Sequence, residues 1–436
     1  MVELSVLTSA TADNTTAINS LWLIVGAALV LIMTPGVAFF YGGMVRAKSV
    51  ISMMMMSFGA MGLVGVLWVL YGYGLSFGGD TLNGEKIGTS LIPHFLGAPS
   101  WGLSTLMGKD GVTPDLYGLS FAGFQATFAI ITVALISGAI ADRARFGPWM
   151  IFAGVWATVV YFPVAYWVFN LSDGWAPAVL HANDFAGGTA VHINAGAAGL
   201  ALALVLGKRV GFAKGMNKPH NVPLTLLGAA LLWFGWFGFN SGSEGAVDGT
   251  AAIAWINTLA APAAGILGWL IVEKFKDGKP TSIGAASGAV AGLVAITPAC
   301  NILTPFWAVV LGILVGVVCA FAIDLKFKLG FDDSLDVVGI HLVGGLLGTL
   351  YIGVFGLTHI DGDATKGYSS LLYGGSFTQL GAQAADAFGV MIYSFVLAFV
   401  IGWIIQKTIG FRVTNEDEVA GVDTVVHGEE GYALVD

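Results

Sequence analysis

The sequence is poor in charged residues. Asp, Glu, Lys and Arg make up 10% of its 436 residues, whereas soluble domains carry about 25%. Hydrophobic residues reach 56%, and the mean hydropathy is +0.82. In a bilayer the backbone groups of such a chain must pair within helices or a closed barrel. The apolar runs are long and continuous rather than alternating, so we expect an all-α polytopic membrane protein.

Other absences exclude other classes. The two cysteines, Cys300 and Cys319, lie in apolar runs and lack metal-ligand spacing, so we expect neither a metal site nor a cofactor. The sequence contains no phosphate-binding loop, GxGxxG turn, HExxH or GxSxG motif, and we therefore expect no enzyme. A net charge of −9 argues against nucleic-acid binding. Glycine is abundant, with 62 residues, which is typical of closely packed membrane helices.

Eleven apolar runs are each long enough to cross a bilayer, which takes about 20 residues. They are residues 20–41, 50–77, 120–140, 149–169, 187–207, 222–242, 250–272, 283–300, 305–324, 338–357 and 386–406. Fifteen Lys and Arg residues fall on the side of the C-terminus, and Lys86, Lys109 and Lys366 fall on the other side. Because basic loops stay in the cytoplasm, we expect eleven transmembrane helices in the plasma membrane, N-out and C-in.

Two of these runs share a pattern. Asp184 precedes His192 by eight residues, and Asp333 precedes His341 by the same interval. The two histidines are five spans apart, so their segments cross the membrane in opposite directions. This predicts an inverted 5+5 repeat, residues 20–207 and 222–357, with its functional site near the midplane. The remaining parts are an extracellular arm (1–19), an eleventh helix (386–406) and a cytoplasmic tail (408–436).

His192 and His341 are the most informative polar residues. A histidine in a span can simply pack against a backbone carbonyl, but ionisable residues there more often face an interior path. Two neutral imidazoles that share a proton offer one donor and one acceptor to a passing polar molecule. Asp184 has two interpretations: an N-cap for the first turn of its helix, or a carboxylate that steadies a nearby cation site.

Aromatic residues recur at helical spacing in two spans. Trp236, Phe239 and Ser243 fall at i, i+3 and i+7, and Phe124 and Phe128 lie on one face of another span. Such stripes are often ordinary core or lipid-facing residues. Beside a hydroxyl near the outer face, they could instead hold a small cation over their rings.

Several segments carry a family resemblance. "DFAGGTAVHINAG" resembles the signature of the ammonium transporter family (Amt, Mep and Rhesus-type proteins), and "TPGVAFFYGGMVR", "FQATFAIITVALISGAIADR", "WFGWFGFNSGS" and "GIHLVGGLLG" are similar to its other conserved blocks. The tail "GFRVTNEDEVAGVDTVVHGEEGY" is similar to that of prokaryotic and plant members. The resemblance implies a homotrimer in the lipid bilayer, with one pore per subunit. It also implies a tail that contacts a neighbouring subunit and responds to a PII-type signal protein; the alternative is a solvated, disordered tail.

The resemblance also assigns residue roles. His192 and His341 match the paired pore histidines, and Asp184 matches an essential aspartate beside the outer site. The ammonium recruitment site matches Phe128, Trp236, Ser243 and Phe169, and the stacked phenyl gate matches Phe124 and Phe239. Phe169 stands where the family often has tryptophan, and three extra residues precede Asp184, so Trp175 is an alternative for that aromatic wall.

These roles imply a mechanism. Ammonium resembles potassium in size and charge, and either ion crosses a dry pore only at a cost that cation–π contacts of about 0.5–2 kcal/mol do not offset. Loss of a proton removes this barrier for ammonium alone. We therefore expect recruitment of ammonium or methylammonium outside, deprotonation, and passage of the neutral amine along the histidines. The alternative is an ammonium sensor that signals through its tail.

Overall fold

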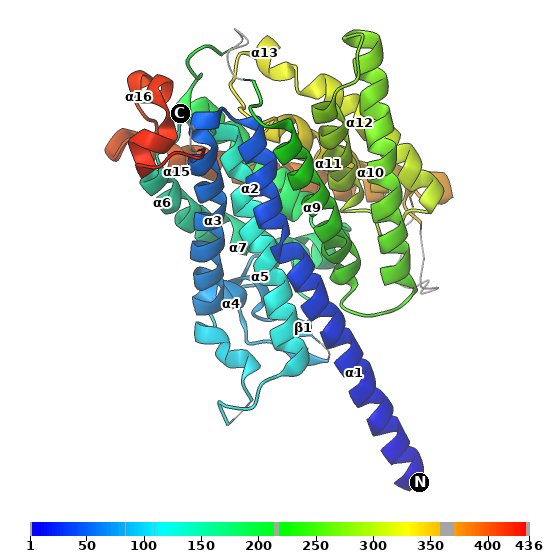
Figure 1. Ribbon diagram of the computed structural model, residues 1–436. Coiled ribbons are helices and arrows are strands. Elements are labelled where there is room, and N and C mark those ends of the chain that lie inside the picture. Colours follow the sequence, from blue (N-terminus) through cyan, green and yellow to red (C-terminus); the bar gives the residue numbers. More distant parts are fainter. Residues whose placement is uncertain (1, 83, 109, 213–217, 358–369, 433–436) are drawn as a thin grey trace.

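The computed structural model describes residues 2–82, 84–108, 110–212, 218–357 and 370–432, which form a bundle of long helices (Figure 1). Within these residues, ten helical segments are long and apolar enough to cross a membrane. A further apolar helix, α11 (Ser282–Ile296), is shorter. The prediction of an all-α polytopic membrane protein is confirmed. The count of eleven spans and their orientation stay predictions.

The first half of the bundle contains the first five expected spans. Their elements are α1 (Val2–Leu31) with α2 (Met33–Met44); α3 (Val50–Leu67), η2 (Trp68–Gly72) and α4 (Tyr73–Phe77), preceded by η1 (Ala47–Ser49); α5 (Leu116–Ile136) with η4 (Ser137–Ile140); α6 (Phe146–Trp156), η5 (Ala157–Tyr161) and α7 (Phe162–Phe169); and η7 (Gly188–Ile193) with α8 (Asn194–Leu206). A short helix, η6 (Trp175–Leu180), lies between the fourth and fifth spans.

The second half contains the other spans. Its elements are α9 (Val222–Ser241) with η8 (Gly242–Glu244); α10 (Gly249–Lys276); α11; α12 (Pro305–Ala322) with α13 (Leu325–Leu329); η9 (Val338–Leu342) with α14 (Val343–Phe355); η10 (Leu371–Tyr373); and α15 (Phe377–Thr408). The tail forms α16 (Asn415–Ala420) and η11 (Asp423–His427).

Two helices are longer than the apolar runs predict. α1 begins at Val2 and extends beyond the bundle (Figure 1), so the described backbone of the N-terminal arm is helical. α15 begins at Phe377, nine residues before the expected start at 386, with Ser376 as its N-cap. Its first turns are polar, and apolar length alone does not detect a helix whose polar side chains are buried against protein.

Short strands lie between the second and third spans. β1 (Thr81–Leu82) pairs with β2 (Glu85–Lys86), β3 (Ser90–Ile92) pairs with β4 (Leu96–Gly97), and η3 (Trp101–Leu106) follows. We call the end of the bundle with β1, β2 and the N-terminus the N-terminal face, and the opposite end, with α13 and α16, the C-terminal face (Figure 1).

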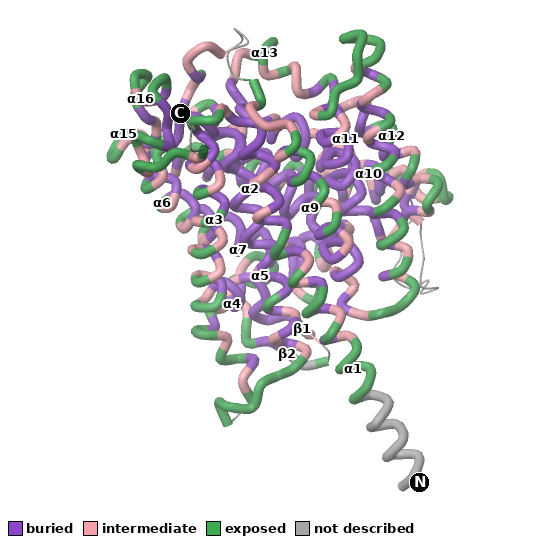
Figure 2. Tube along the Cα trace, in the orientation of Figure 1, coloured by how far each residue is buried: buried purple, intermediate pink, exposed green. Residues whose placement is uncertain are grey.

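Buried residues fill the middle of the bundle, and many exposed positions lie along its sides (Figure 2). Large apolar side chains are among the exposed ones: Phe234 and Ile392 expose 58% and 59% of their surface. In lipid, such a surface carries no hydrophobic penalty. Inside, glycines allow close contact: a Cβ on Gly196 would lie 2.5 Å from the backbone nitrogen of Leu342. α8 and η9 therefore approach backbone to backbone.

The tail lies against the C-terminal face of its own chain. Glu418 is fully buried; its carboxylate accepts from the Val210 backbone N–H at 2.7 Å and from the Arg412 guanidinium at 2.8 Å. The Asp423 carboxylate accepts from two backbone N–H groups at the start of α3, at 2.7 and 3.0 Å. The described part of the tail, up to residue 432, is therefore docked rather than a free, solvated end.

Candidate functional site

His192 and His341 lie against each other in the middle of the bundle. Their Nδ1 atoms are 3.2 Å apart, and their rings are nearly parallel, with centroids 5.3 Å apart. Both side chains are almost fully buried. A hydrogen bond between two ring nitrogens requires one donor and one acceptor, so the neutral pair shares a single proton between its Nδ1 atoms. The Nε2 atom of His192 has no hydrogen-bond partner among the described residues.

Each histidine sits in a π-helical turn. His192 belongs to η7 and His341 to η9, and each π turn continues into an α-helix, α8 or α14. Such single turns are rare and often mark functional sites. Tight packing fixes η7 on one side, because a Cβ on Gly188 would lie 2.5 Å from the Pro298 ring. The absence of a side chain on Gly188 therefore lets η7 approach the Pro298 ring closely.

Asp184 caps the turn that carries His192. Its Oδ1 accepts from the N–H groups of Gly187 and Gly188 at 2.9 and 2.6 Å, and its Oδ2 accepts from those of Thr189 and Ala190 at 2.7 and 3.0 Å. Burial raises the pKa of this carboxyl, and the four backbone donors act in the opposite direction. The N-cap interpretation is therefore confirmed, and contact with a cation is not needed to explain this side chain.

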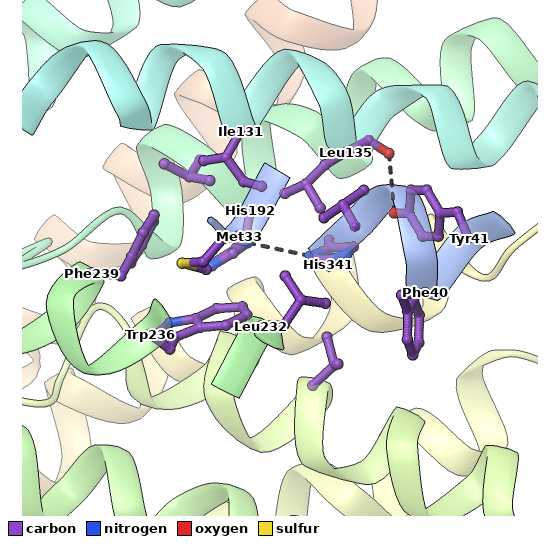
Figure 3. A pocket seen from close by; sticks show the side chains of 13 residues that line it. Met33, Phe40, Tyr41, Ile131, Leu135, His192, Leu232, Trp236, Phe239 and His341 are labelled. Atoms are coloured by element: carbon purple, nitrogen blue, oxygen red, sulfur yellow. Dashed lines mark hydrogen bonds between the residues drawn. The ribbon is translucent and has the colours of Figure 1, made fainter. Parts of the chain in front are cut away.

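An apolar cavity runs beside the two imidazoles (Figure 3). The cavity has a volume of about 10 Å³, close to what one water-sized molecule needs. The lining residues with polar side-chain nitrogen or oxygen atoms are His192, His341, Tyr41 and Trp236. It is lined by Met33, Val37, Phe40, Tyr41, Ile131, Leu135, Val191, His192, Leu232, Trp236, Phe239, Val290 and His341.

Trp236 lies deeper than expected. Its ring stacks on His192, with centroids 5.3 Å apart, and its Nε1 donates to the Thr297 hydroxyl at 2.8 Å. It also lines the cavity with His341 (Figure 3). The assignment of Trp236 to the outer recruitment site is therefore wrong in position, because Phe239 and Ser243 follow it along α9 toward the N-terminal face.

The stacked phenyl pair also differs from the expected one. Phe128 stacks on Phe239, with ring centroids 4.0 Å apart and an interplanar angle of 14°. Phe124 is tilted against Phe128 at 4.9 Å, and a Cβ on Gly242 would lie 2.9 Å from its ring. The expected pair of Phe124 and Phe239 is thus replaced by Phe128 and Phe239. α5 runs inward from the N-terminal face, so its later residue reaches the depth of Phe239.

Phe169, and not Trp175, lies next to this pair. The Phe169 ring meets Phe128 edge to face, with centroids 6.0 Å apart. Trp175 instead packs against Trp167 at 6.0 Å, and its ring lies 2.7 Å from a Cβ built on Gly389. Phe169 and Phe124 are therefore the two aromatic rings that flank Phe128.

Ser243 is half-buried beside this aromatic group. Its hydroxyl donates to the Phe239 carbonyl at 2.7 Å, which leaves the oxygen lone pairs free to accept from a cation. The predicted outer residues thus gather where the Phe128–Phe239 pair meets the N-terminal face, with Trp236 as the exception.

Sequence reasoning missed several residues that the structure brings into the site. Tyr41 lines the cavity and donates its hydroxyl proton to the Leu135 carbonyl at 3.2 Å, and Thr297 holds the indole of Trp236. The signal for Tyr41 was weak, because a tyrosine in an apolar run is also typical of membrane interfaces.

Three comparisons with known proteins agree. The model of the Ammonium Transporter Family matches residues 21–432. An ammonium transporter of Mycobacterium tuberculosis is 52% identical, over 95% of this chain and 90% of that protein. Among solved structures, Candida albicans Mep2 has a TM-score of 0.79 and 34% identity, over 92% of this chain and 87% of that one. A structure described as a sensor Amt protein has a TM-score of 0.84 and 27% identity, over 95% and 99%. Because the matches run through almost the whole sequence, this chain belongs to the ammonium transporter family.

Proposed function

We propose that this protein transports ammonium and methylammonium across the membrane by passing the neutral amine through the cavity beside His192 and His341. The observation that carries this proposal is the pair of Nδ1-bonded imidazoles beside an otherwise apolar cavity. Ammonia needs both a donor and an acceptor to replace its water contacts, and the paired rings present both at their outer nitrogens. The membrane fold and the family relationship support this function.

The apolar lining explains how ammonium is separated from potassium. A monovalent cation in a dry, apolar path loses its hydration without a charge partner, at a cost of many kcal/mol. We propose that Phe124, Phe169 and Ser243 recruit the cation, that a proton leaves there, and that the stacked Phe128–Phe239 pair excludes water and ions. Loss of a proton is open to ammonium and closed to potassium, so it provides selectivity. No catalytic chemistry is part of this proposal.

Reconstituted vesicles test this function. Uptake of labelled methylammonium and membrane current are recorded together in proteoliposomes of the purified protein. We expect saturable uptake that protein-free vesicles lack, and the current shows whether the released proton also crosses. Binding of ammonium without flux would contradict transport and favour the sensor alternative.

The outer site makes a separate prediction. Phe169→Trp should lower the half-saturation concentration for methylammonium by about 2- to 5-fold, because tryptophan is a stronger cation–π partner than phenylalanine and a gain of about 0.5–1 kcal/mol lies within the range of such contacts. Concentration-dependent uptake measures the change. Trp175→Phe is the matched control and should leave half-saturation unchanged, because Trp175 packs against Trp167. An effect of Trp175→Phe alone would assign the aromatic wall to Trp175.

We propose that the chain works as a homotrimer in the plasma membrane, with the N-terminal face outside and the C-terminal face in the cytoplasm. The distribution of Lys and Arg supports this orientation: Arg46, Arg209 and Arg412 all lie in the charged network of the C-terminal face. Positive loops remain on the cytoplasmic side. We also propose that a cytoplasmic PII-type protein acts on the docked tail.

The tail makes its own prediction. Deletion of residues 412–436 should leave trimers intact but lower uptake by about 5-fold or more, the lower end of typical coupling between distant sites. The deletion frees the N–H groups that Asp423 caps on α3 and leaves the N–H of Val210 without Glu418. Glu418→Gln is a milder matched variant that keeps the chain length. If the deletion variant forms trimers and keeps wild-type uptake, contact between the tail and the C-terminal face is not needed for transport.

A further inference from the structure

α15 carries a polar stripe on the face that packs against the bundle. Gln379, Gln383 and Asp386 are spaced i, i+4 and i+7, so they share one side of the helix, and all three are buried. The two glutamines are structural: Gln379 donates to the His181 carbonyl at 3.2 Å, and Gln383 donates to the Asn183 carbonyl at 2.8 Å. They hold the segment that leads into η7.

Asp386 differs from these glutamines. Its side chain is fully buried within the long apolar helix α15, and among the described residues neither carboxyl oxygen has a hydrogen-bond partner within bonding geometry. The turn η7, which contains Thr189, packs on α15, and the Thr189 hydroxyl and the charge of Asp184 both influence the pKa of Asp386. Among the described residues, the helices α8, α14, α6, η7, η6 and η5 that pack on α15 contain no Lys or Arg. Hydropathy did not indicate this burial, because the expected span 386–406 placed Asp386 at the membrane surface.

The elements packed on α15 carry few other titratable groups near this position. η7 contributes His192, η5 contributes Tyr161 and α14 contributes Tyr351, and none of them is among the groups that act on Asp386. An ionised Asp386 would therefore be a buried, unpaired charge beside a second carboxylate, which is among the least favourable arrangements in a membrane.

The two carboxyl groups have opposite environments. Asp184 accepts four backbone N–H bonds, which suits an ionised carboxylate because that form only accepts. Asp386 has no such donors, and a neutral acid suits its site because it needs no charge partner and offers an O–H donor. Neighbouring carboxyls in contrasting environments divide into one base and one acid.

We propose that Asp386 keeps a proton in the working protein and turns this O–H toward the Thr189 hydroxyl as a hydrogen-bond donor, so that it is a positioning residue for the π turn of His192. Thr189 links three elements: its N–H donates to Asp184, its hydroxyl lies 3.4 Å from that of Thr349 in α14, and its turn contains His192. A hydrogen bond from protonated Asp386 would also connect Thr189 to α15. Ionisation would place a second negative charge beside Asp184 and push η7 away from α15.

Infrared spectroscopy tests the proton directly. A protonated carboxyl has a C=O stretching band that an ionised one lacks. At neutral pH, the difference between wild type and Asp386→Asn in lipid should contain this band. Ser394→Ala is the matched control: Ser394 is buried on the same face of α15 and donates to the Asn194 carbonyl at 2.8 Å, and its removal should leave the band in place. A missing band in the wild type would overturn the proposal.

Measurements of methylammonium uptake, which rest on the proposed function, test the positioning role of Asp386. Methylammonium uptake by the wild type should fall at alkaline pH as Asp386 loses its proton. Asp386→Asn cannot ionise and keeps N–H donors, so its uptake should stay near wild type at neutral pH and lose the alkaline fall. Asp386→Leu lacks a donor and should lower uptake about 2- to 10-fold at all pH values, the range expected for one hydrogen bond.

The outcomes separate the two proposals. If the wild type transports nothing while the infrared band is present, the proposed function fails and the protonated Asp386 stands. If Asp386→Asn transports with the same alkaline fall as the wild type, Asp386 has no positioning role. Sodium-dependent uptake that Asp386→Asn abolishes would show that the carboxyl is ionised and holds a cation, which also overturns the proposal.

Discussion

Replacing Asp184 by alanine should abolish transport and sharply lower the yield of folded protein. The substitution removes the acceptors of four backbone N–H groups at the start of η7. Each buried donor without a partner costs about 1–3 kcal/mol, so the sum is roughly 4–12 kcal/mol. That range approaches the whole stability of a typical folded domain, about 5–15 kcal/mol. Vesicle uptake and thermal unfolding in detergent measure the two effects.

Asp184→Asn separates capping from charge. Its amide oxygen still accepts from one pair of N–H groups, while its NH₂ group faces the other pair and cannot accept. We expect a folded protein of reduced stability and low transport. An alanine variant that is stable and active would show that the four bonds are not needed to hold the turn of His192.

Asp333 provides the matched control from the other half of the chain. Its Oδ2 accepts from the Val338 N–H at 2.7 Å, while its Oδ1 has no partner among the described residues. Burial raises the pKa of Asp333 to about 6. Both carboxyls have a raised pKa, but Asp333 accepts one backbone N–H bond where Asp184 accepts four, so Asp333→Ala should cost far less than Asp184→Ala. A similar loss of stability in both variants would mean that the two aspartates contribute equally to holding their turns.

The main architecture and the histidine pair follow from the sequence. The equal spacing of Asp184 to His192 and Asp333 to His341, five spans apart, predicted that the imidazoles meet, and their Nδ1 atoms are 3.2 Å apart. Hydropathy cannot show that both sit in π turns, because a one-residue change in helical winding leaves no trace in the pattern. The structure adds this detail.

The main error of the sequence analysis was the predicted depth of the aromatic residues in the bundle, although the direction of each helix would have corrected it. α5 runs inward from the N-terminal face and α9 runs toward it, so Phe124 precedes Phe128 in depth, while Trp236 lies below Phe239. Residues at i and i+4 share a helix face. Helical spacing alone therefore could not show whether Phe124 or Phe128 stacks on Phe239. Chain direction, combined with the expected orientation, would have selected Phe128 as the partner of Phe239.

Replacing either pore histidine by leucine should lower methylammonium uptake by about 5- to 150-fold. His192→Leu leaves Nδ1 of His341 without its partner, and one buried unsatisfied polar group costs about 1–3 kcal/mol. The passing amine also loses a donor or acceptor at the centre of an apolar path. Uptake by purified, folded variants in vesicles measures this loss. Wild-type uptake in both leucine variants would show that the pair is structural.

His341→Glu is the sharper test, because it keeps a group that can carry a proton but adds one that can carry charge. A carboxylate beside the cavity would offer a passing cation the charge partner that the wild-type lining lacks. We therefore expect the variant to take up ammonium and also to admit potassium, measured as potassium-driven current in vesicles that is absent from the wild type. The substitution keeps both residues of the Phe128–Phe239 stack. If it conducts ammonium and still excludes potassium, selectivity resides in that stack, and the histidines only assist passage of the neutral amine.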